Sequence, residues 1–100
     1  MDFKKNVEIL GSPGVARQLT AGATSAATQL TSNVYRISMR AVGADIRYII
    51  QGGTGTASAT TSHFIADGER LDFSVTSGAY ICYIRDDAAI EGVLELTELN

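Results

Sequence analysis

The stretch Asn33-Val-Tyr-Arg-Ile-Ser-Met-Arg-Ala-Val42 alternates apolar with polar residues, and it decides the fold class of this 100-residue chain. The same two-residue period recurs in Arg70–Val75 and in Val93–Thr97. A period of two places alternate side chains on opposite faces of a β-strand, so each of these segments is predicted to bury one face. The residues predicted to point inward are Tyr35, Ile37, Met39, Ala41, Leu71, Phe73, Val75, Leu94 and Leu96.

Further strands are predicted at Val15–Thr20, at Ile46–Ile50 and at Ala79–Ile84. Because Ala79–Ile84 is apolar on both faces, we expect it to be a central strand that buries Cys82. The tight connection Gly43-Ala-Asp45 predicts that the strands on either side of it form a hairpin.

Turn and loop signals separate these strands at intervals of about 8–12 residues, a spacing typical of sandwiches and barrels. Asp67-Gly68 and Ser77-Gly78 are turn dipeptides. The long Thr/Ala/Ser/Gly-rich segment Gln51–Ser62 is expected to be an exposed, mobile loop, and Arg85–Gly92 an acidic loop. The sequence therefore predicts an all-β fold, a small antiparallel β-sandwich or barrel.

An extended N-terminal arm, residues 1–14, is expected to precede a single all-β domain at residues 15–100. The arm has an apolar stripe without a clean helical or strand period, and Gly11-Ser-Pro-Gly14 then breaks the chain. Such an arm either packs on its own sandwich or acts as a tether that reaches a neighbour. The stripe consists of Phe3, Val7, Ile9 and Leu10.

The formal net charge of −3 argues against nucleic acid as a partner, because affinity for phosphate backbones depends on clustered Lys and Arg. Arg36 and Arg40 share one strand face, where they form a solvated face, pair with Asp45 or Asp72, or make an anion site. No stretch of about 20 apolar residues predicts a membrane span, and the first residues lack the apolar core of a signal peptide. The protein is therefore expected to be made in the cytoplasm.

Candidate catalytic residues are few. His63 is the only histidine, and adjacent strand residues point to opposite faces, so Ser62 and His63 are not expected to converge as a nucleophile and its base. The cluster of Asp86, Asp87 and Glu91 lacks the spacing of an EF-hand calcium loop. Gly52-Gly-Thr-Gly55 lacks the pattern of a phosphate-binding loop. We therefore predict no catalytic, cofactor or metal site, and a protein that is not an enzyme.

Residues 28–99 resemble a group of small β-rich proteins encoded among the structural genes of tailed bacteriophages. The resemblance lies in the order of pieces: a strand ending in small residues, a hairpin, a Thr/Ala/Ser-rich loop, an apolar pair with Ala-x-Gly, a short strand and a terminal strand of the form G-x-L-x-[VL]-T-E. In this chain the pieces are Val34–Val42, Ile46–Ile50, Gly55–Ser62, Phe64-Ile-Ala-Asp-Gly68, Leu71–Val75 and Gly92-Val-Leu-Glu-Leu-Thr-Glu98.

The resemblance implies a virion component, and in its most concrete form a capsid decoration, or cement, protein on the surface of the assembled shell. The implied partners are the major capsid protein and further copies of this chain, with a trimer favoured. Two alternatives stay open: a low-copy head-completion or tail-attached module, and a carbohydrate- or host-surface-binding domain that uses the Gly52–Ser62 loop and exposed tyrosines. The residues expected at the partner interface are Phe3, Val7, Ile9, Leu10 and Val15.

Overall fold

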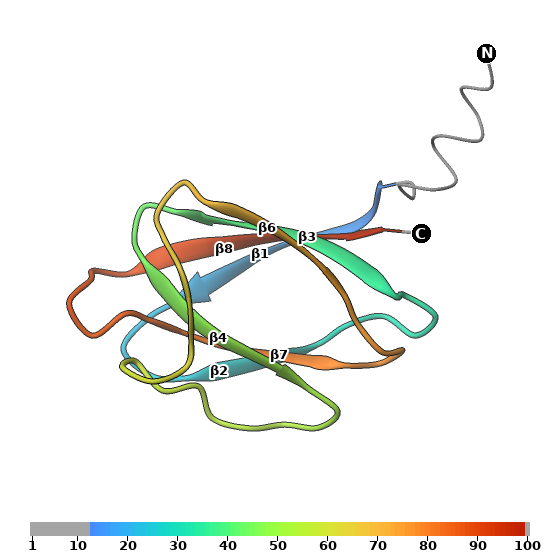
Figure 1. Cartoon of the computed structure of the whole chain (residues 1–100), viewed down its shortest axis with the longest axis horizontal. Coiled ribbons are helices and arrows are strands. Elements are labelled where there is room, and N and C mark those ends of the chain that lie inside the picture. Colours follow the sequence, from blue (N-terminus) through green and yellow to red (C-terminus); the bar gives the residue numbers. More distant parts are fainter. Residues whose placement is uncertain (1–12, 100) are drawn as a thin grey trace, which may run out of the picture.

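The structure is a computed structural model that describes residues 13–99, and its eight strands form two antiparallel sheets packed face to face (Figure 1). The prediction of an all-β sandwich is confirmed. Sheet A has the strand order β1-β8-β3-β6, and sheet B has the order β2-β7-β4-β5. The strands are β1 (Pro13–Ala21), β2 (Ala26–Gln29), β3 (Arg36–Val42), β4 (Ile46–Gln51), β5 (His63–Ile65), β6 (Arg70–Ser74), β7 (Tyr80–Arg85) and β8 (Gly92–Leu99).

The pairing follows one rule: β1 pairs with β8, β2 with β7, β3 with β6 and β4 with β5. The first four strands and the last four thus form a single antiparallel ribbon. The ribbon is rolled so that β8 also pairs with β3 and β7 also pairs with β4. Eight strands wound in this way into two sheets make a jelly roll.

The main core lies between the two sheets. Ile37, Met39, Ile81 and Leu94 have no exposed surface, and Leu96 is 1% exposed. These residues sit at alternate positions of their strands, as the two-residue period predicts. The predicted inward positions of β3 and β8 are therefore confirmed, apart from Tyr35, which precedes β3 and is 56% exposed.

One prediction about strand arrangement is wrong. β3 and β4 do not form a hairpin, because Gly43–Asp45 carries the chain from sheet A to sheet B. Instead β3 lies between β8 and β6. β8 is a central strand of sheet A, paired with β1 on one side and β3 on the other. The alternation of apolar residues identifies the buried face of a strand, not the sheet to which that strand belongs.

The prediction of a central strand at Ala79–Ile84 is confirmed, since β7 lies between β2 and β4 and buries both of its faces. Ile81 and Tyr83 point into the main core. Cys82 and Ile84 point to the outer face of sheet B, where they form a second buried cluster with Ala57. The loop between β4 and β5 supplies Ala57 and covers the part of this face over Cys82 and Ile84 (Figure 1).

The loop after β4 therefore packs more closely than its composition indicates, and the prediction that it is simply exposed is wrong at Ala57, which is 2% exposed. The backbone N–H of Ala57 donates to the hydroxyl of Ser25 at 2.8 Å. Farther along, the backbone N–H of Asp87 donates to the carbonyl of Ala59 at 3.0 Å. Hydrogen bonds at both points fix this loop against sheet B.

We predict that Leu94→Ala lowers the free energy of unfolding by about 2–5 kcal/mol, because Leu94 is fully buried in a central strand and the change leaves a cavity. The matched control is Thr97→Ala on the outer face of the same strand, which should change the stability by about 0.5 kcal/mol or less. Urea unfolding measures both variants. Equal effects of the two variants would contradict the assignment of faces in β8.

Candidate functional site

The outer face of sheet A is open. None of the side chains on this face is buried, and no other part of residues 13–99 covers it. In this respect it differs from the outer face of sheet B, where the β4–β5 loop buries Cys82 and Ile84 but leaves Phe64 43% exposed. We refer to this surface as the open face. Its outward residues are Ala16, Gln18, Thr20, Arg36, Ser38, Arg40, Val42, Arg70, Asp72, Ser74, Val93, Glu95, Thr97 and Leu99.

Like charges lie side by side on the open face. Arg40 of β3 is directly opposite Arg70 of β6, and on its other side it is opposite Glu95 of β8. Like charges directly opposite each other destabilise a sheet. Arg70 turns toward Ser38, donating from Nη1 to the hydroxyl at 3.0 Å. The open face carries three arginines and two acids, Asp72 and Glu95, so its net charge is +1, whereas the whole chain has a net charge of −3.

Asp72 and Asp45, the acidic residues considered as partners of Arg36 and Arg40, lie in different parts of the fold. Asp72 lies opposite Ser38, between the two arginines and one strand away, so it shares the open face with them. Asp45 lies in the turn between sheets, where its carboxylate accepts from the backbone N–H of Asp67 at 2.8 Å. Arg17 and Arg47 form salt bridges with Glu98 and Asp86.

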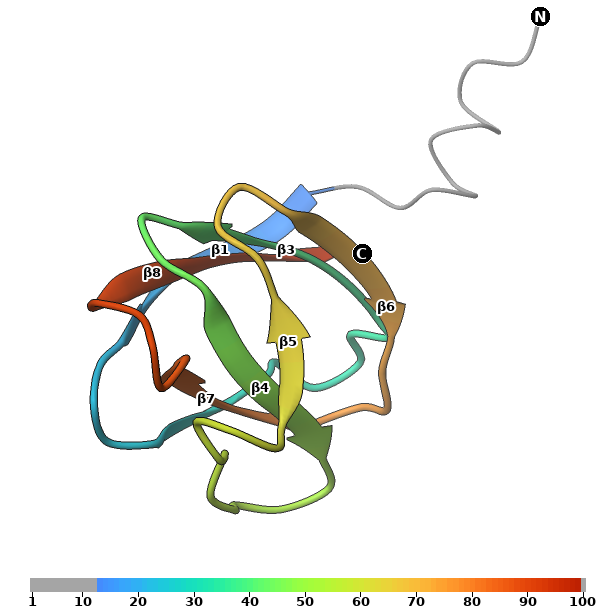
Figure 2. The ribbon, with the colours of Figure 1, turned by 60° about the vertical axis from the view of Figure 1, so that its left-hand side comes forward.

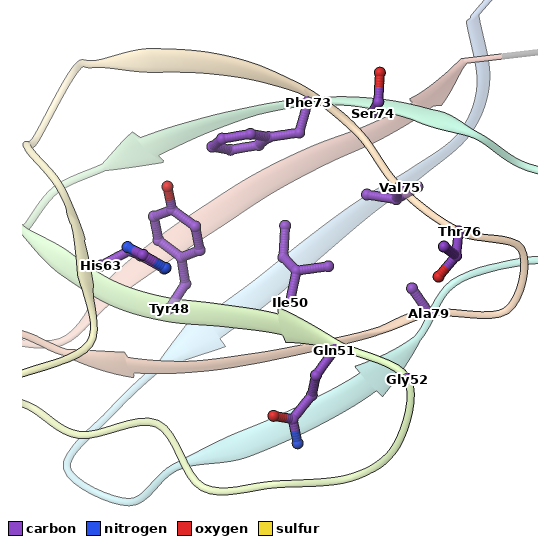
Figure 3. A pocket seen from close by; sticks show the side chains of 10 residues that line it. All are labelled: Tyr48, Ile50, Gln51, Gly52, His63, Phe73, Ser74, Val75, Thr76 and Ala79. Carbon is purple, nitrogen blue, oxygen red and sulfur yellow. The ribbon is translucent and has the colours of Figure 1, made fainter.

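A groove lies between the edge of β4 in sheet B and the edge of β6 in sheet A (Figure 3). Its volume is about 370 Å³. Tyr48 forms an aromatic wall, with its ring centroid 5.5 Å from that of His63 and 5.8 Å from that of Phe73. Burial, and next the nearby Glu69 carboxylate, raise the pKa of Tyr48, so its hydroxyl is uncharged at neutral pH. The groove is lined by Tyr48, Ile50, Gln51, Gly52, His63, Phe73, Ser74, Val75, Thr76 and Ala79.

His63 and Ser62, the two residues considered as a catalytic pair, have separate partners. The imidazole ring of His63 packs beside Tyr48, at the rim of the groove. The Ser62 hydroxyl accepts from the backbone N–H of Ser58 at 2.8 Å and closes a turn of the β4–β5 loop. Each of these side chains thus has a structural role in its own segment.

The acidic loop forms a turn held by Asp86. One oxygen of this carboxylate accepts from Arg47 Nε at 2.7 Å, and the other accepts from the backbone N–H of Ala88 at 3.1 Å. The hydrogen bond from the Arg47 side chain is the main cause of a lowered pKa of Asp86, and the bond from Ala88 adds to it. Within residues 13–99 no group of three or more His, Cys, Asp or Glu side chains is placed to hold a metal ion.

One buried ion pair was not predicted from the sequence. Glu98 of β8 is completely buried, and its Oε2 accepts from Arg17 Nη2 at 3.1 Å and from the backbone N–H of Thr31 at 2.9 Å. Burial raises the pKa of Glu98, but the bonds from Thr31 and Arg17 outweigh it, so the pKa is lowered overall. The signal was present in the sequence, because Glu98 has the same parity as Leu94 and Leu96.

The residues expected at the partner interface fall into two groups. Val15 lies on β1 and is 45% exposed. The others lie outside the residues that the structure describes: Phe3, Val7, Ile9 and Leu10. β1 begins at Pro13 and pairs there with Leu99, so residues 13 and 14 belong to the strand.

The comparisons with known proteins add no relative. No protein-family model, no curated protein and no solved structure matches this chain. Over residues 13–99 there is also no helix with the length and apolar character needed to cross a membrane.

We predict that Glu98→Gln lowers the free energy of unfolding at pH 7 by about 1–3 kcal/mol, since it weakens charged hydrogen bonds to a buried group. The folded state holds the pKa of Glu98 below the unfolded value of about 4.3, so the carboxylate stabilises the fold above that pH. This contribution is lost as the pH falls from about 4.3 through the lower folded pKa. The difference between the two proteins should therefore be smaller at pH 3 than at pH 7.

Urea midpoints at the two pH values measure this effect, with Glu95→Gln on the open face as the control. Glu95 makes a 3.3 Å contact with Gln18 on the exposed surface, and its substitution should have little effect at either pH. A stability loss for Glu98→Gln that is the same at both pH values would show that the carboxylate charge is not what matters.

Proposed function

We propose that this chain is a structural virion protein: a capsid decoration, or cement, protein that binds the outer surface of an assembled bacteriophage shell and stabilises contacts between capsomers. The observation that carries the proposal is the difference between the two outer faces of the sandwich. Within residues 13–99, the β4–β5 loop covers the Cys82 and Ile84 part of the outer face of sheet B, whereas nothing covers the open face of sheet A. The resemblance over residues 28–99 supports the same role.

The open face suits contact with a broad protein surface. Its central rows alternate small and medium side chains, such as Ser38, Thr97 and Val93, with the long side chains of β3 and β8. Arg40 and Arg70 supply charge that an acidic patch on a partner would neutralise, and such complementarity fixes orientation and suppresses wrong partners. Arginine is also enriched at protein interfaces.

The jelly roll itself does not select the function, because the same architecture is found in viral capsid domains, lectins and cupins. The proposed partners are the major capsid protein and other copies of this chain, with a trimer favoured; neither nucleic acid nor a membrane is proposed as a partner. The proposed location is the capsid surface of the virion, after synthesis in the host cytoplasm.

The N-terminal segment is proposed to act as a tether, and its contacting residues to be Phe3, Val7, Ile9 and Leu10, continued by Val15 at the start of the domain. In this role the apolar side chains of the segment are buried against the partner. Since β1 begins at Pro13, a deletion that tests the tether should remove residues 1–12 and keep the whole strand.

We predict that deleting residues 1–12 leaves the urea midpoint of the domain unchanged, because residues 13–99 contain both buried clusters. The same deletion should reduce the amount of protein that sediments with particles lacking it by at least tenfold. Unchanged sedimentation of the truncated protein would remove the tether from the proposal.

We also predict that Arg40→Ala weakens binding to the same particles, by about tenfold if Arg40 meets an acidic group that becomes buried. The control is Arg85→Ala at the end of β7 in sheet B, which removes the same charge at a site away from the open face. Co-sedimentation across a salt series measures both variants. Equal losses for the two variants would indicate an effect of net charge and not of the open face.

Carbohydrate binding is the second candidate, and the aromatic wall of the groove is the observation that favours it. Tyr48, His63 and Phe73 line a concave site, and Gln51 and Thr76 are among its polar lining residues. A glycan array distinguishes the two proposals, since a decoration protein should show no hits. A low-copy head-completion or tail-attached role differs from decoration only in the number of copies per particle.

A further inference from the structure

The groove lies beside a free strand edge. β5 has only three residues, and it pairs with β4 at Ile46, Arg47 and Tyr48. β4 continues through Gln51, so its last three residues have no strand partner on that side within the described chain (Figure 2). Before His63, the chain turns away at Ser58–Ser62 toward the outer face of sheet B. The backbone there is open to an added strand.

The groove beside this edge is apolar at its base and large enough for side chains. Ile50, Phe73 and Val75 are partly buried hydrophobic residues packed against the main core, and Ala79 is 2% exposed. Its volume of about 370 Å³ corresponds to about a dozen water molecules. A free strand edge with an adjacent apolar pocket is the combination by which sheets bind extended peptides: the backbone pairs with the edge, and alternate side chains enter the pocket.

The other long edge of the sandwich is less suitable for such pairing. β1 is the edge strand of sheet A, and Arg17 within it points to the inner face, where it pairs with Glu98. An inward-pointing charge is one of the devices by which edge strands avoid adding a further strand. The part of β4 beyond Tyr48 consists of Ile49, Ile50 and Gln51, and it has no charged residue. The groove edge is therefore the better acceptor of the two.

We infer that the groove binds the N-terminal segment, residues 1–12, of a second copy of this chain. The inference rests on the proposed tether role and names the surface that holds the tether. The segment has alternate apolar residues at Val7 and Ile9, which share one face when the chain is extended. Extended, twelve residues span up to about 40 Å, which is ample to reach an adjacent molecule.

The position of Pro13 supports this occupant. Pro13 is in register with Leu99, Leu99 with Arg36, and Arg36 with Ser74 at the groove. The segment therefore leaves the domain at the same end of sheet A at which the groove lies, about 14 Å away over three strand spacings. Copies arranged side by side, with the β1 edge of one beside the groove of the next, would bring each segment to a groove and could close into a ring.

A second copy is favoured over the same molecule because of what lies between Pro13 and the groove. The connection from β2 to β3 crosses this end of the sandwich, held by bonds from Leu30 N to Ala79 O at 2.8 Å and from Val75 N to Tyr35 O at 2.8 Å. To reach its own groove, the segment would have to reverse direction and pass over this connection. A neighbouring molecule presents its groove without that obstacle.

Crosslinking between full-length chains tests the inference. One protein carries Asn6→Cys or Glu8→Cys in the segment, and a second, affinity-tagged protein carries Thr76→Cys at the groove. The native Cys82 is fully buried and should not react. After mixing and treatment with a short bismaleimide, a tagged heterodimer should form in at least tenfold higher yield than with the matched control Thr20→Cys, which lies exposed on β1 at the far edge. Adding Val7→Asp and Ile9→Asp to the segment should abolish that yield.

Two results would overturn the inference. Equal heterodimer yields with Thr76→Cys and Thr20→Cys would show that the groove has no preference for the segment. A chain carrying both Glu8→Cys and Thr76→Cys that crosslinks only within itself, while the mixture gives no heterodimer, would assign the groove to the molecule's own segment. Particle binding is measured in parallel and distinguishes failure of this inference from failure of the proposed function. If the segment is required for particle binding but no heterodimer forms, the decoration role stands and the second copy is ruled out as the partner of the segment.

Discussion

The structure depends on a single constraint: each sheet has one apolar face, and the two faces must be buried against each other by one continuous ribbon of paired strands. The pairing of β1 with β8, β2 with β7, β3 with β6 and β4 with β5 meets this requirement. Its consequence is that every connection except that between β4 and β5 crosses from one sheet to the other. The exception is the long loop, which is free to fold back over sheet B.

That loop accounts for the asymmetry on which the functional proposal is based. β7 is apolar on both faces, so Cys82 and Ile84 need a cover on the outside, and Ala57 provides it. The outer faces of β3 and β8 mix polar side chains with Val42, Val93 and Leu99, and no loop within residues 13–99 covers them. Because the β4–β5 loop turns toward the outer face of sheet B, β5 is short and the end of β4 has no strand partner beside the groove. One connection thus produces the covered face and the free edge, and the open face remains opposite.

Much of the fold could be predicted from the sequence, because alternation reports burial directly. The strands β1, β3, β4, β6, β7 and β8 and the turns at Gly68 and Gly78, which have positive φ, follow from residue patterns. Pairing partners could not be predicted, since a short connection such as Gly43–Asp45 is compatible with a hairpin and with a crossing between sheets. The ion pair of Arg17 and Glu98 was missed because charged side chains are assigned to solvent by default. The open face and the groove both require knowledge of the strand order.

The central claim is that this chain works as an abundant surface component of a virion, bound through its open face and its N-terminal segment. The most direct test is quantitative mass spectrometry of density-banded particles from the source lysate, expressed as copies of this chain per copy of the major shell protein. The account predicts a near-stoichiometric ratio. Absence of the chain from purified particles would contradict the virion assignment, and a few copies per particle would contradict the decoration role.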